Sequence, residues 1–94
     1  MKRCLIVPDA LRELIRHLSP HLKISIIRAL DEILVDPSTG KPLYEELEGL
    51  RTYKIGKFRI IYRVKDMEIA LVAMGPRKTI YQKMLLEIKH RIHK

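Results

Sequence analysis

The sequence predicts an α+β fold of order β-α-α-β-β-β-α, in which three helices pack on a small twisted antiparallel β-sheet. Two changes of hydrophobic spacing lead to this prediction. Apolar residues recur every three or four positions in residues 11–34 and again in residues 81–92, which is typical of helices. From residue 50 to residue 74 the spacing falls to every second residue, as in strands. The 94 residues are 47% hydrophobic, which suits one globular domain over residues 1–94.

The N-terminal part predicts a strand and a first helix. Residues 3–7 are apolar and partly β-branched, so they are expected to form a strand that ends at Pro8. Pro8 also suits the first turn of a helix, where its missing N–H leaves no bond unmade. The apolar face of this helix is formed by Leu11, Leu14, Ile15 and Leu18.

A second helix, antiparallel to the first, is expected after a short corner at Ser19-Pro20. It should end at Asp36-Pro37, because a residue before proline avoids helical geometry. Residues 37–42 then predict a loop, since they include Ser38, Thr39 and Gly40. The apolar face of the second helix is formed by Leu22, Ile26, Leu30, Ile33 and Leu34.

Three strands follow, in residues 50–55, 58–65 and 68–74, with tight turns at Gly56-Lys57 and Asp66-Met67. The third is almost continuously apolar, so we expect it inside the sheet. The second strand alternates between a core face of Phe58, Ile60, Tyr62 and Val64 and an exposed, mostly cationic face of Arg59, Ile61, Arg63 and Lys65.

A last amphipathic helix is expected after Gly75-Pro76, which should break the third strand. The helix would bring its N-terminal end close to the turn of the first hairpin. Its apolar face is formed by Tyr81, Met84, Leu85, Ile88 and Ile92.

The strand register predicts that like charges meet. A turn at Gly56-Lys57 places Lys54 directly opposite Arg59, and such a pair destabilises a sheet unless an anion lies between the two cations. The second turn pairs Lys65 with Glu68, and the same register places Met74 across from Arg59. The end of the third strand is therefore expected beside the turn of the first hairpin.

Lys54, Arg59 and Arg77 are expected to converge at that end, next to Tyr81. Oriented cations stabilise the extra negative charge of a pentavalent phosphodiester transition state, and arginine grips two phosphate oxygens. The Tyr81 ring can stack on a base, or its hydroxyl can take part in proton transfer. Because Tyr81 also fits the apolar face of its helix, core packing is an equal alternative.

The charge is segregated along the chain. Residues 1–48 hold seven Lys/Arg and eight Asp/Glu, a net charge of −1, whereas residues 49–94 hold twelve Lys/Arg and three Asp/Glu, a net charge of +9. Six of the basic residues and no acidic one fall between Gly49 and Lys65. This segregation favours a polyanion or an acidic protein as partner over a basic surface that only aids solubility.

The remaining composition argues against several other classes of site. Cys4 is the only cysteine and cannot form an internal disulfide, which fits a reducing cytoplasm, and its apolar neighbours suggest a small core residue. The apolar run that ends at Pro8 is too short for a signal peptide or a membrane span. The pairs His17/His21 and His90/His93 have no carboxylate or cysteine set beside them, so no metal or cofactor is expected.

At these residues the sequence resembles the RelE/ParE superfamily of toxin–antitoxin toxins, and specifically its RelE branch. The similarity covers nearly the whole chain, including residues 7–11, Asp36-Pro37 followed by Gly40 and Leu43, and residues 47–50. Its most specific part is residues 53–62, which look like the family's basic hairpin. Residues 75–81, Gly-Pro-Arg-Lys-Thr-Ile-Tyr, are similar to the family's closing Gly-His-Arg…Tyr segment, with Pro76 in place of the histidine that many relatives have.

The resemblance implies a RelE-like fold and a metal-independent endoribonuclease that cuts mRNA in the ribosomal A site, neutralised by an acidic antitoxin. By matching positions, Arg59 would stabilise the transition state, Arg77 would contact the phosphate or protonate the leaving oxygen, and Tyr81 would complete the site. Lys54 would be the basic-strand residue, and since Pro76 leaves no histidine, the general base is open between Lys54 and a carboxylate of Glu45, Glu46 or Glu48. The residues expected to bind RNA are Arg51, Lys57 and Lys78, with Arg51 or Lys57 as alternatives to Lys54.

Two other functions fit the same fold, and the fold alone does not separate them. One is a ParE-like toxin that binds DNA gyrase and has no nuclease site. The other is a degenerate module that binds RNA or an antitoxin without catalysis, which Pro76 makes plausible. The combination of Lys54, Arg59, Arg77 and Tyr81 favours the nuclease.

Overall fold

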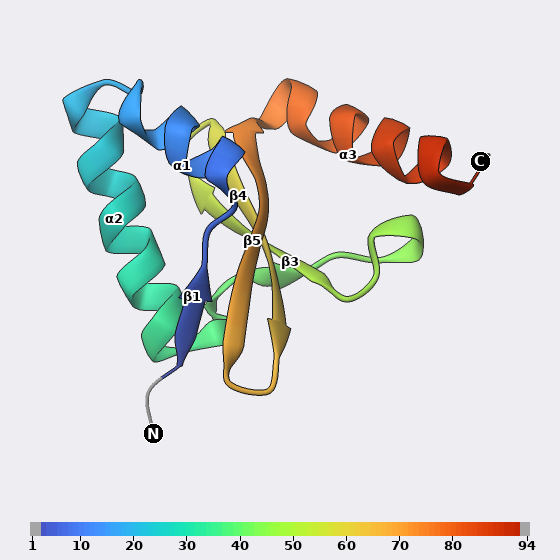
Figure 1. Cartoon of the computed structure of the whole chain (residues 1–94), viewed down its shortest axis with the longest axis horizontal. Coiled ribbons are helices and arrows are strands. Elements are labelled where there is room, and N and C mark those ends of the chain that lie inside the picture. The colour runs from blue at the N-terminus through green and yellow to red at the C-terminus, as the bar shows by residue number, and fades with distance from the viewer. Residues whose placement is uncertain (1–2, 93–94) are drawn as a thin grey trace.

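A five-stranded sheet of order β1-β5-β4-β3-β2 forms the centre of the computed structural model, which describes residues 3–92 and the side chains of residues 3–86. The predicted α+β fold is confirmed (Figure 1). The strands are β1 (Cys4–Ile6), β2 (Lys41–Pro42), β3 (Leu50–Ile55), β4 (Phe58–Lys65) and β5 (Glu68–Pro76). The helices are α1 (Asp9–Arg16), α2 (Pro20–Val35) and α3 (Arg77–Ile92), with short 3₁₀ turns η1 (Pro37–Thr39) and η2 (Glu45–Leu47).

The sheet differs from the prediction at its two edges. β1 pairs with β5 in parallel, whereas every other pair is antiparallel. The expected loop over residues 37–42 contains the two-residue strand β2, which pairs Lys41 with Thr52 and Pro42 with Arg51. A strand of two residues is too short to show a hydrophobic period, so the sequence pattern does not reveal it.

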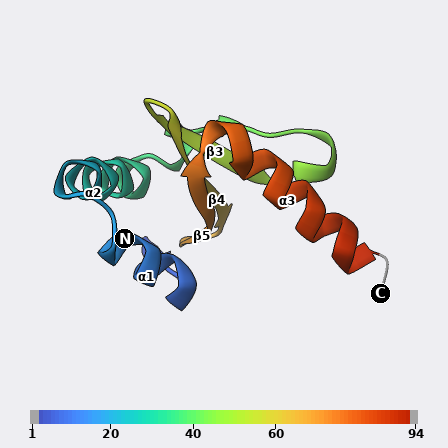
Figure 2. The ribbon, with the colours of Figure 1, turned by 90° about the horizontal axis from the view of Figure 1, so that it is seen from above.

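Each face of the sheet has its own apolar core. Figure 2 shows α1 and α2 on one side of the sheet and α3 on the other. The first core joins α2 to one face through Ile26, Ala29, Leu30, Ile33, Ile60, Tyr62, Ile69, Leu71 and Met74. The second joins α3 and η2 to the other face through Leu47, Leu50, Ile61, Ile80 and Met84.

The second core corrects the expected exposed face of β4. Ile61 is fully buried because η2 and α3 cover this part of the sheet, and Arg59 is only 7% exposed. Arg63 and Lys65 are exposed as expected, since they lie at the other end of the strand. The cationic face is therefore split into a buried end beside α3 and an exposed end beside the Asp66-Met67 turn.

The two N-terminal helices form as predicted, and in Figure 1 α1 crosses the top of the view while α2 runs down beside the sheet. The Ser19 side chain accepts a hydrogen bond from the Leu22 N–H and caps α2, which starts with Pro20 in its first turn. Leu14, predicted on the apolar face of α1, is 38% exposed. The expectation that Cys4 is a core residue is wrong, because it lies exposed on the edge strand β1.

The register between β4 and β5 contains one irregularity. Lys65 pairs with Glu68 as predicted and Tyr62 pairs with Leu71, but Ile61 pairs with Ala73, so Val72 is an extra residue on β5. Beyond this bulge Arg59 lies opposite Gly75 and not opposite Met74, which corrects the predicted register by one residue. The strand also continues through Gly75-Pro76, which were expected to break it.

The helix α3 starts at Arg77 and continues the chain directly from β5. Ile80 and Met84 bury their side chains in the second core, whereas Leu85, expected on the same face, is 41% exposed. Ile88 and Ile92, also expected there, lie outside the residues whose side chains are described.

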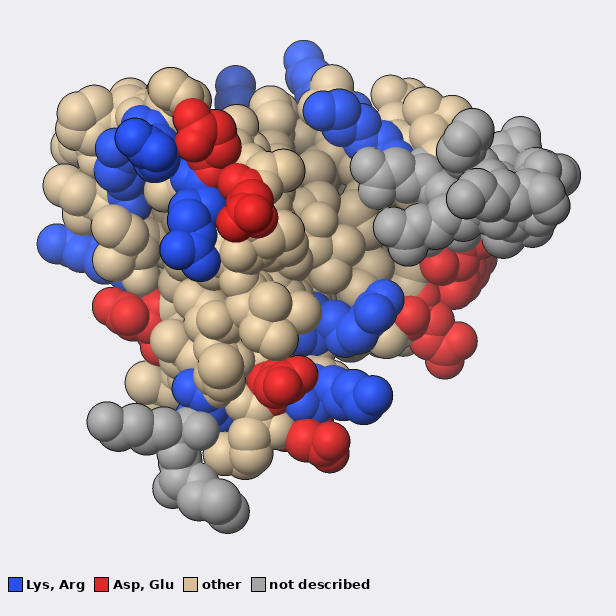
Figure 3. All heavy atoms as spheres, viewed as in Figure 1, with Lys and Arg blue, Asp and Glu red and all other residues tan. Residues whose placement is uncertain are grey.

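The face of the molecule shown in Figure 3 carries Lys and Arg interspersed with Asp and Glu. The charge segregation along the sequence therefore does not make this face uniformly cationic. No helix in the described part of the chain is long and apolar enough to cross a membrane.

Candidate functional site

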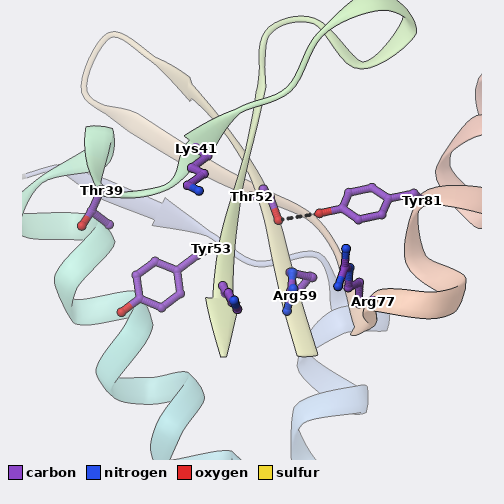
Figure 4. A pocket seen from close by; sticks show the side chains of 8 residues that line it. Thr39, Lys41, Thr52, Tyr53, Arg59, Arg77 and Tyr81 are labelled. Carbon is purple, nitrogen blue, oxygen red and sulfur yellow. Dashed lines mark hydrogen bonds between the residues drawn. The ribbon is translucent and has the colours of Figure 1, made fainter. Parts of the chain in front are cut away.

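A pocket of about 560 Å³ opens beside the tip of the β3–β4 hairpin (Figure 4). We call it the hairpin pocket. Its lining combines four cations, two threonines and two tyrosines, and contains no carboxylate. The lining residues are Thr39, Lys41, Thr52, Tyr53, Lys54, Arg59, Arg77 and Tyr81.

Strand pairing places the polar residues of the pocket on one face of the sheet. Lys54 lies directly opposite Arg59, as predicted, and Thr52 precedes Lys54 by two residues on the same face. Lys41 of β2 pairs with Thr52 and therefore joins this face. The opposite neighbour of Arg59 on β5 is Gly75, which has no side chain to fill the space.

The guanidinium of Arg59 is held by the hairpin turn. Its Nη1 donates to the Gly56 carbonyl at 2.7 Å and to the Phe58 carbonyl at 3.0 Å. Gly56 has a φ of 56°, in the left-handed region that the tight turn requires and that glycine adopts most easily. The turn thus holds Arg59 at the wall of the pocket, and the other N–H groups of its guanidinium remain available to a ligand.

Arg77 begins α3 at the same end of the sheet. Its backbone N–H donates to the Lys57 carbonyl at 2.7 Å, which ties the start of the helix to the hairpin turn. Its side chain is exposed and lines the pocket beside Arg59 (Figure 4). The predicted convergence of Lys54, Arg59 and Arg77 is therefore observed as shared pocket lining.

Tyr81 lies one turn further along α3. Its hydroxyl is 3.1 Å from the Thr52 Oγ1, so the two side chains share a hydrogen bond across the pocket wall. The ring is partly buried and packs against the second core. The structure thus shows a ring that packs in the core, and a hydroxyl that reaches the pocket.

The residues Lys41 and Thr39 were not predicted as site residues. They reach the pocket because the segment 37–41 is fastened to the sheet. The buried Tyr62 hydroxyl donates to the Pro37 carbonyl at 2.6 Å and accepts from the Gly40 N–H at 2.9 Å. Burial raises the pKa of Tyr62, so its hydroxyl stays protonated and able to donate. These contacts join residues more than twenty positions apart, so no local sequence pattern predicts them.

The three residues expected to bind RNA do not line the hairpin pocket. Arg51 is half-buried and its Nη1 donates to the carbonyls of Ser38 and Gly40. Like Tyr62, Arg51 therefore holds the segment 37–41 against the sheet. Lys57 and Lys78 line a neighbouring cavity of about 440 Å³ together with Pro76 and Arg77. Arg77 therefore lies between the two cavities.

The cations that line the pocket form no ion pair with the side chains of residues 3–86. Among the side chains that the structure describes, the ion pairs all involve Glu13 of α1, which contacts Arg16 and also His17, the residue after the helix. Glu45, Glu46 and Glu48 are exposed and do not line the pocket. An unpaired group of cations around a concavity is suited to bind an anion.

Residues able to hold a metal do not gather in the described part of the chain. No three His, Cys, Asp or Glu side chains lie together there. Of the two histidine pairs, His17 bonds to Glu13 at 2.9 Å, and His90 and His93 lie outside the residues whose side chains are described.

Comparison with known proteins gives one family and several similar structures. A family model described as the ParE toxin of type II toxin–antitoxin system, parDE, matches residues 7–81. No curated protein sequence matches the chain. A mutant of the E. coli toxin RelE in the free state has a TM-score of 0.73 and 18% identity, covering 98% of this chain and 99% of that chain.

Two complexes contain similar chains. The toxin–antitoxin complex RelBE2 from Mycobacterium tuberculosis gives a TM-score of 0.71 and 22% identity, covering 82% of this chain and 100% of that chain. The archaeal RelE–RelB complex from Pyrococcus horikoshii gives a TM-score of 0.67 and 17% identity, covering 82% of this chain and 97% of that chain. These similarities show the fold. The family model adds the sequence match, and it spans every residue that lines the hairpin pocket. This chain therefore belongs to the RelE/ParE superfamily of toxins of type II toxin–antitoxin systems.

Proposed function

We propose that this toxin is a metal-independent endoribonuclease that cleaves mRNA in the ribosomal A site and so inhibits translation in the cytoplasm. The observation that supports the proposal is the hairpin pocket, in which Lys54, Arg59, Arg77 and Tyr81 share one concavity without a carboxylate in its lining. Such a set of donors favours a phosphodiester over a neutral or cationic ligand.

In the proposed reaction the ribose 2′-oxygen attacks the adjacent phosphorus while the bond from phosphorus to the 5′-oxygen breaks. The products are a 2′,3′-cyclic phosphate and a 5′-hydroxyl. Arg59 and Arg77 stabilise the charge of the pentavalent transition state, which is worth about 3 kcal/mol for each oriented donor. Lys54 acts in its neutral amine form, takes the proton of the 2′-hydroxyl and becomes an ammonium, while Arg77 or Tyr81 gives a proton to the leaving oxygen.

We further propose an acidic antitoxin as the partner that neutralises the toxin. The similar chains from Mycobacterium tuberculosis and Pyrococcus horikoshii were solved as complexes with antitoxins. The net charge of +9 in residues 49–94, from twelve basic and three acidic residues, would steer an acidic protein toward this half of the chain.

Inhibition of DNA gyrase is the second candidate, because the family model that matches the chain is described as a ParE toxin. Toeprinting of mRNA on ribosomes and a gyrase supercoiling assay, run on the same preparation, decide between them. The proposal expects a cleavage product on ribosomes that disappears in Arg77→Ala, with supercoiling unaffected. Loss of supercoiling without a toeprint would establish the gyrase function, and neither effect would indicate a module that only binds.

A further inference from the structure

We propose that Lys41 binds a second phosphate of the RNA, so that the hairpin pocket takes a segment with two consecutive phosphodiesters. The inference rests on the proposed function, because it assumes that Arg59 and Arg77 hold the scissile phosphate. It adds a binding residue, and it defines the substrate at this site as a strand that continues across the pocket.

The geometry places Lys41 on a different side of the pocket from the two arginines. Figure 4 shows Lys41 entering the pocket from the β2 side, whereas Arg59 and Arg77 lie toward α3. Strand β3 separates Lys41 on β2 from Arg59 on β4. Neighbouring strands lie about 4.8 Å apart, so the backbones of Lys41 and Arg59 are separated by roughly 10 Å across β3, and Lys41 pairs with Thr52 and not with Lys54, the partner of Arg59.

Lys41 is positioned more firmly than its exposed place at the edge of the sheet suggests. The residue before it, Gly40, is buried and bonds to the Tyr62 hydroxyl through its N–H and to Arg51 through its carbonyl. A Cβ at Gly40 would lie 2.9 Å from the Thr52 carbonyl and closer still to the Tyr62 hydroxyl, so the segment is pressed against the sheet. These contacts place the Lys41 backbone and lower the entropy lost when its ammonium binds a ligand.

Charge also supports a phosphate at this place. Lys41 has no acidic partner among the described side chains, and the pocket between it and Arg59 is lined by Thr52 and Lys54, which are a neutral donor and a further cation. A polyanion that runs from the arginines toward β2 therefore meets donors along its whole path.

Two short uncleavable RNA probes test the proposal. A 2′-O-methyl trinucleotide has two phosphodiesters, and the corresponding dinucleotide has one. We expect the parent to bind the trinucleotide more tightly in an NMR titration. Lys41→Ala should weaken the trinucleotide about three- to tenfold, as for one charge-assisted hydrogen bond at a partly exposed site, and the dinucleotide less than twofold. Lys41→Arg should restore the affinity.

Lys65→Ala is the matched control, because it removes an exposed strand lysine that does not line the pocket. It should change neither affinity by more than twofold. The salt dependence gives a second readout, since Lys41→Ala should lower the slope of log affinity against log salt for the trinucleotide by about 0.7.

Three outcomes would overturn the second phosphate site: Lys41→Ala affects both probes equally, Lys41→Ala affects neither, or the parent binds the trinucleotide no better than the dinucleotide. Toeprinting of the parent on ribosomes tests the proposed function separately from the role of Lys41. Cleavage there, together with any of these outcomes, would leave the proposed function in place and remove only the role of Lys41.

Discussion

Lys54 on β3 and Arg59 on β4 lie directly opposite each other on one face of the sheet, at the wall of a pocket without acidic lining. Like charges in this position repel, and no described carboxylate forms an ion pair with either residue. The arrangement is unfavourable in the free protein and becomes favourable when an anion lies between the two cations.

Replacing Lys54 with threonine should therefore stabilise the free protein while it impairs the reaction. We expect the free energy of unfolding to rise by about 0.2–1 kcal/mol, because the like-charge pair is removed. Urea unfolding measures this change. The control is Lys65→Thr, which makes the same change opposite Glu68, a residue of opposite charge, and should not raise the stability. A destabilised Lys54→Thr would show that the pair does not repel.

Arg59 and Arg77 should respond differently to alanine. Arg77 is exposed, so Arg77→Ala should change the stability by no more than about 0.5 kcal/mol. Arg59 is buried and bonds to two carbonyls of the turn, so Arg59→Ala should cost about 1–3 kcal/mol. Both should lower ribosome-dependent cleavage about 10²- to 10³-fold. If Arg77→Ala cleaves like the parent, its assignment to the phosphate is wrong.

The Tyr81 hydroxyl can be tested apart from the Tyr81 ring. Tyr81→Phe and Thr52→Val each break the hydrogen bond between the two side chains, so each should lower the free energy of unfolding by about 0.5–1.5 kcal/mol. Only Tyr81→Phe removes a group that can transfer a proton, so it should reduce cleavage more. Antitoxin binding should stay within a few-fold of the parent. Equal cleavage by the two variants would argue for a structural role alone.

Asp36 links pH to the segment that carries Lys41. The hydroxyl and N–H of Ser38 both donate to its carboxylate, and these bonds lower the pKa of Asp36 below its usual 3.8. A lowered pKa stabilises the fold above pH 3.8, and this contribution is lost as the pH falls through the lowered value. Ser38→Ala should raise the pKa of Asp36 in a carboxyl NMR titration.

The destabilisation by Ser38→Ala should accordingly be present at neutral pH and vanish in acid. The control is Ser25→Ala, which removes a hydroxyl bonded to the backbone carbonyl of His21. Its effect on stability should not shrink as Asp36 becomes protonated. An Asp36 titration that is unchanged in Ser38→Ala would contradict the assignment.

Ribosome binding should weaken steeply with salt. The net charge of residues 49–94 is +9, from twelve basic and three acidic residues. The attraction between this charge and a polyanion is screened over about 10 Å at 0.1 M salt. Filter binding at several salt concentrations measures the slope. An affinity that stays flat between low and physiological salt would mean that charge does not guide the encounter.

The part of the site that the sequence predicts correctly depends on local geometry. The Gly56-Lys57 turn determines the register of β3 and β4, so the opposition of Lys54 and Arg59 follows from the position of one turn. Arg77 could be placed because it directly follows β5.

What the sequence does not predict depends on contacts between distant residues. Lys41 reaches the pocket only through the bonds of Tyr62 and Arg51 to residues 37–40. The burial of Ile61 depends on α3 and η2 covering β4, which the alternation within β4 does not reveal. The bulge at Val72 is not predicted because β5 is apolar on both faces. Its sequence therefore shows no alternation of apolar and polar residues that an extra residue could interrupt.

The extra residue in β5 also determines how open the pocket is. If Val72 paired with Ile61, the register that begins at Lys65 and Glu68 would continue unbroken, and Met74 would face Arg59 and leave the first core. Because Val72 is left out of the pairing, Gly75 takes that place, and even a Cβ there would touch Ile80 at 3.5 Å. The access of an anion to Arg59 is thus set by whether Val72 is left out of the ladder or paired within it. A β5 that paired through Val72 without a bulge would close the site with a methionine side chain, although Val72 itself does not line the pocket.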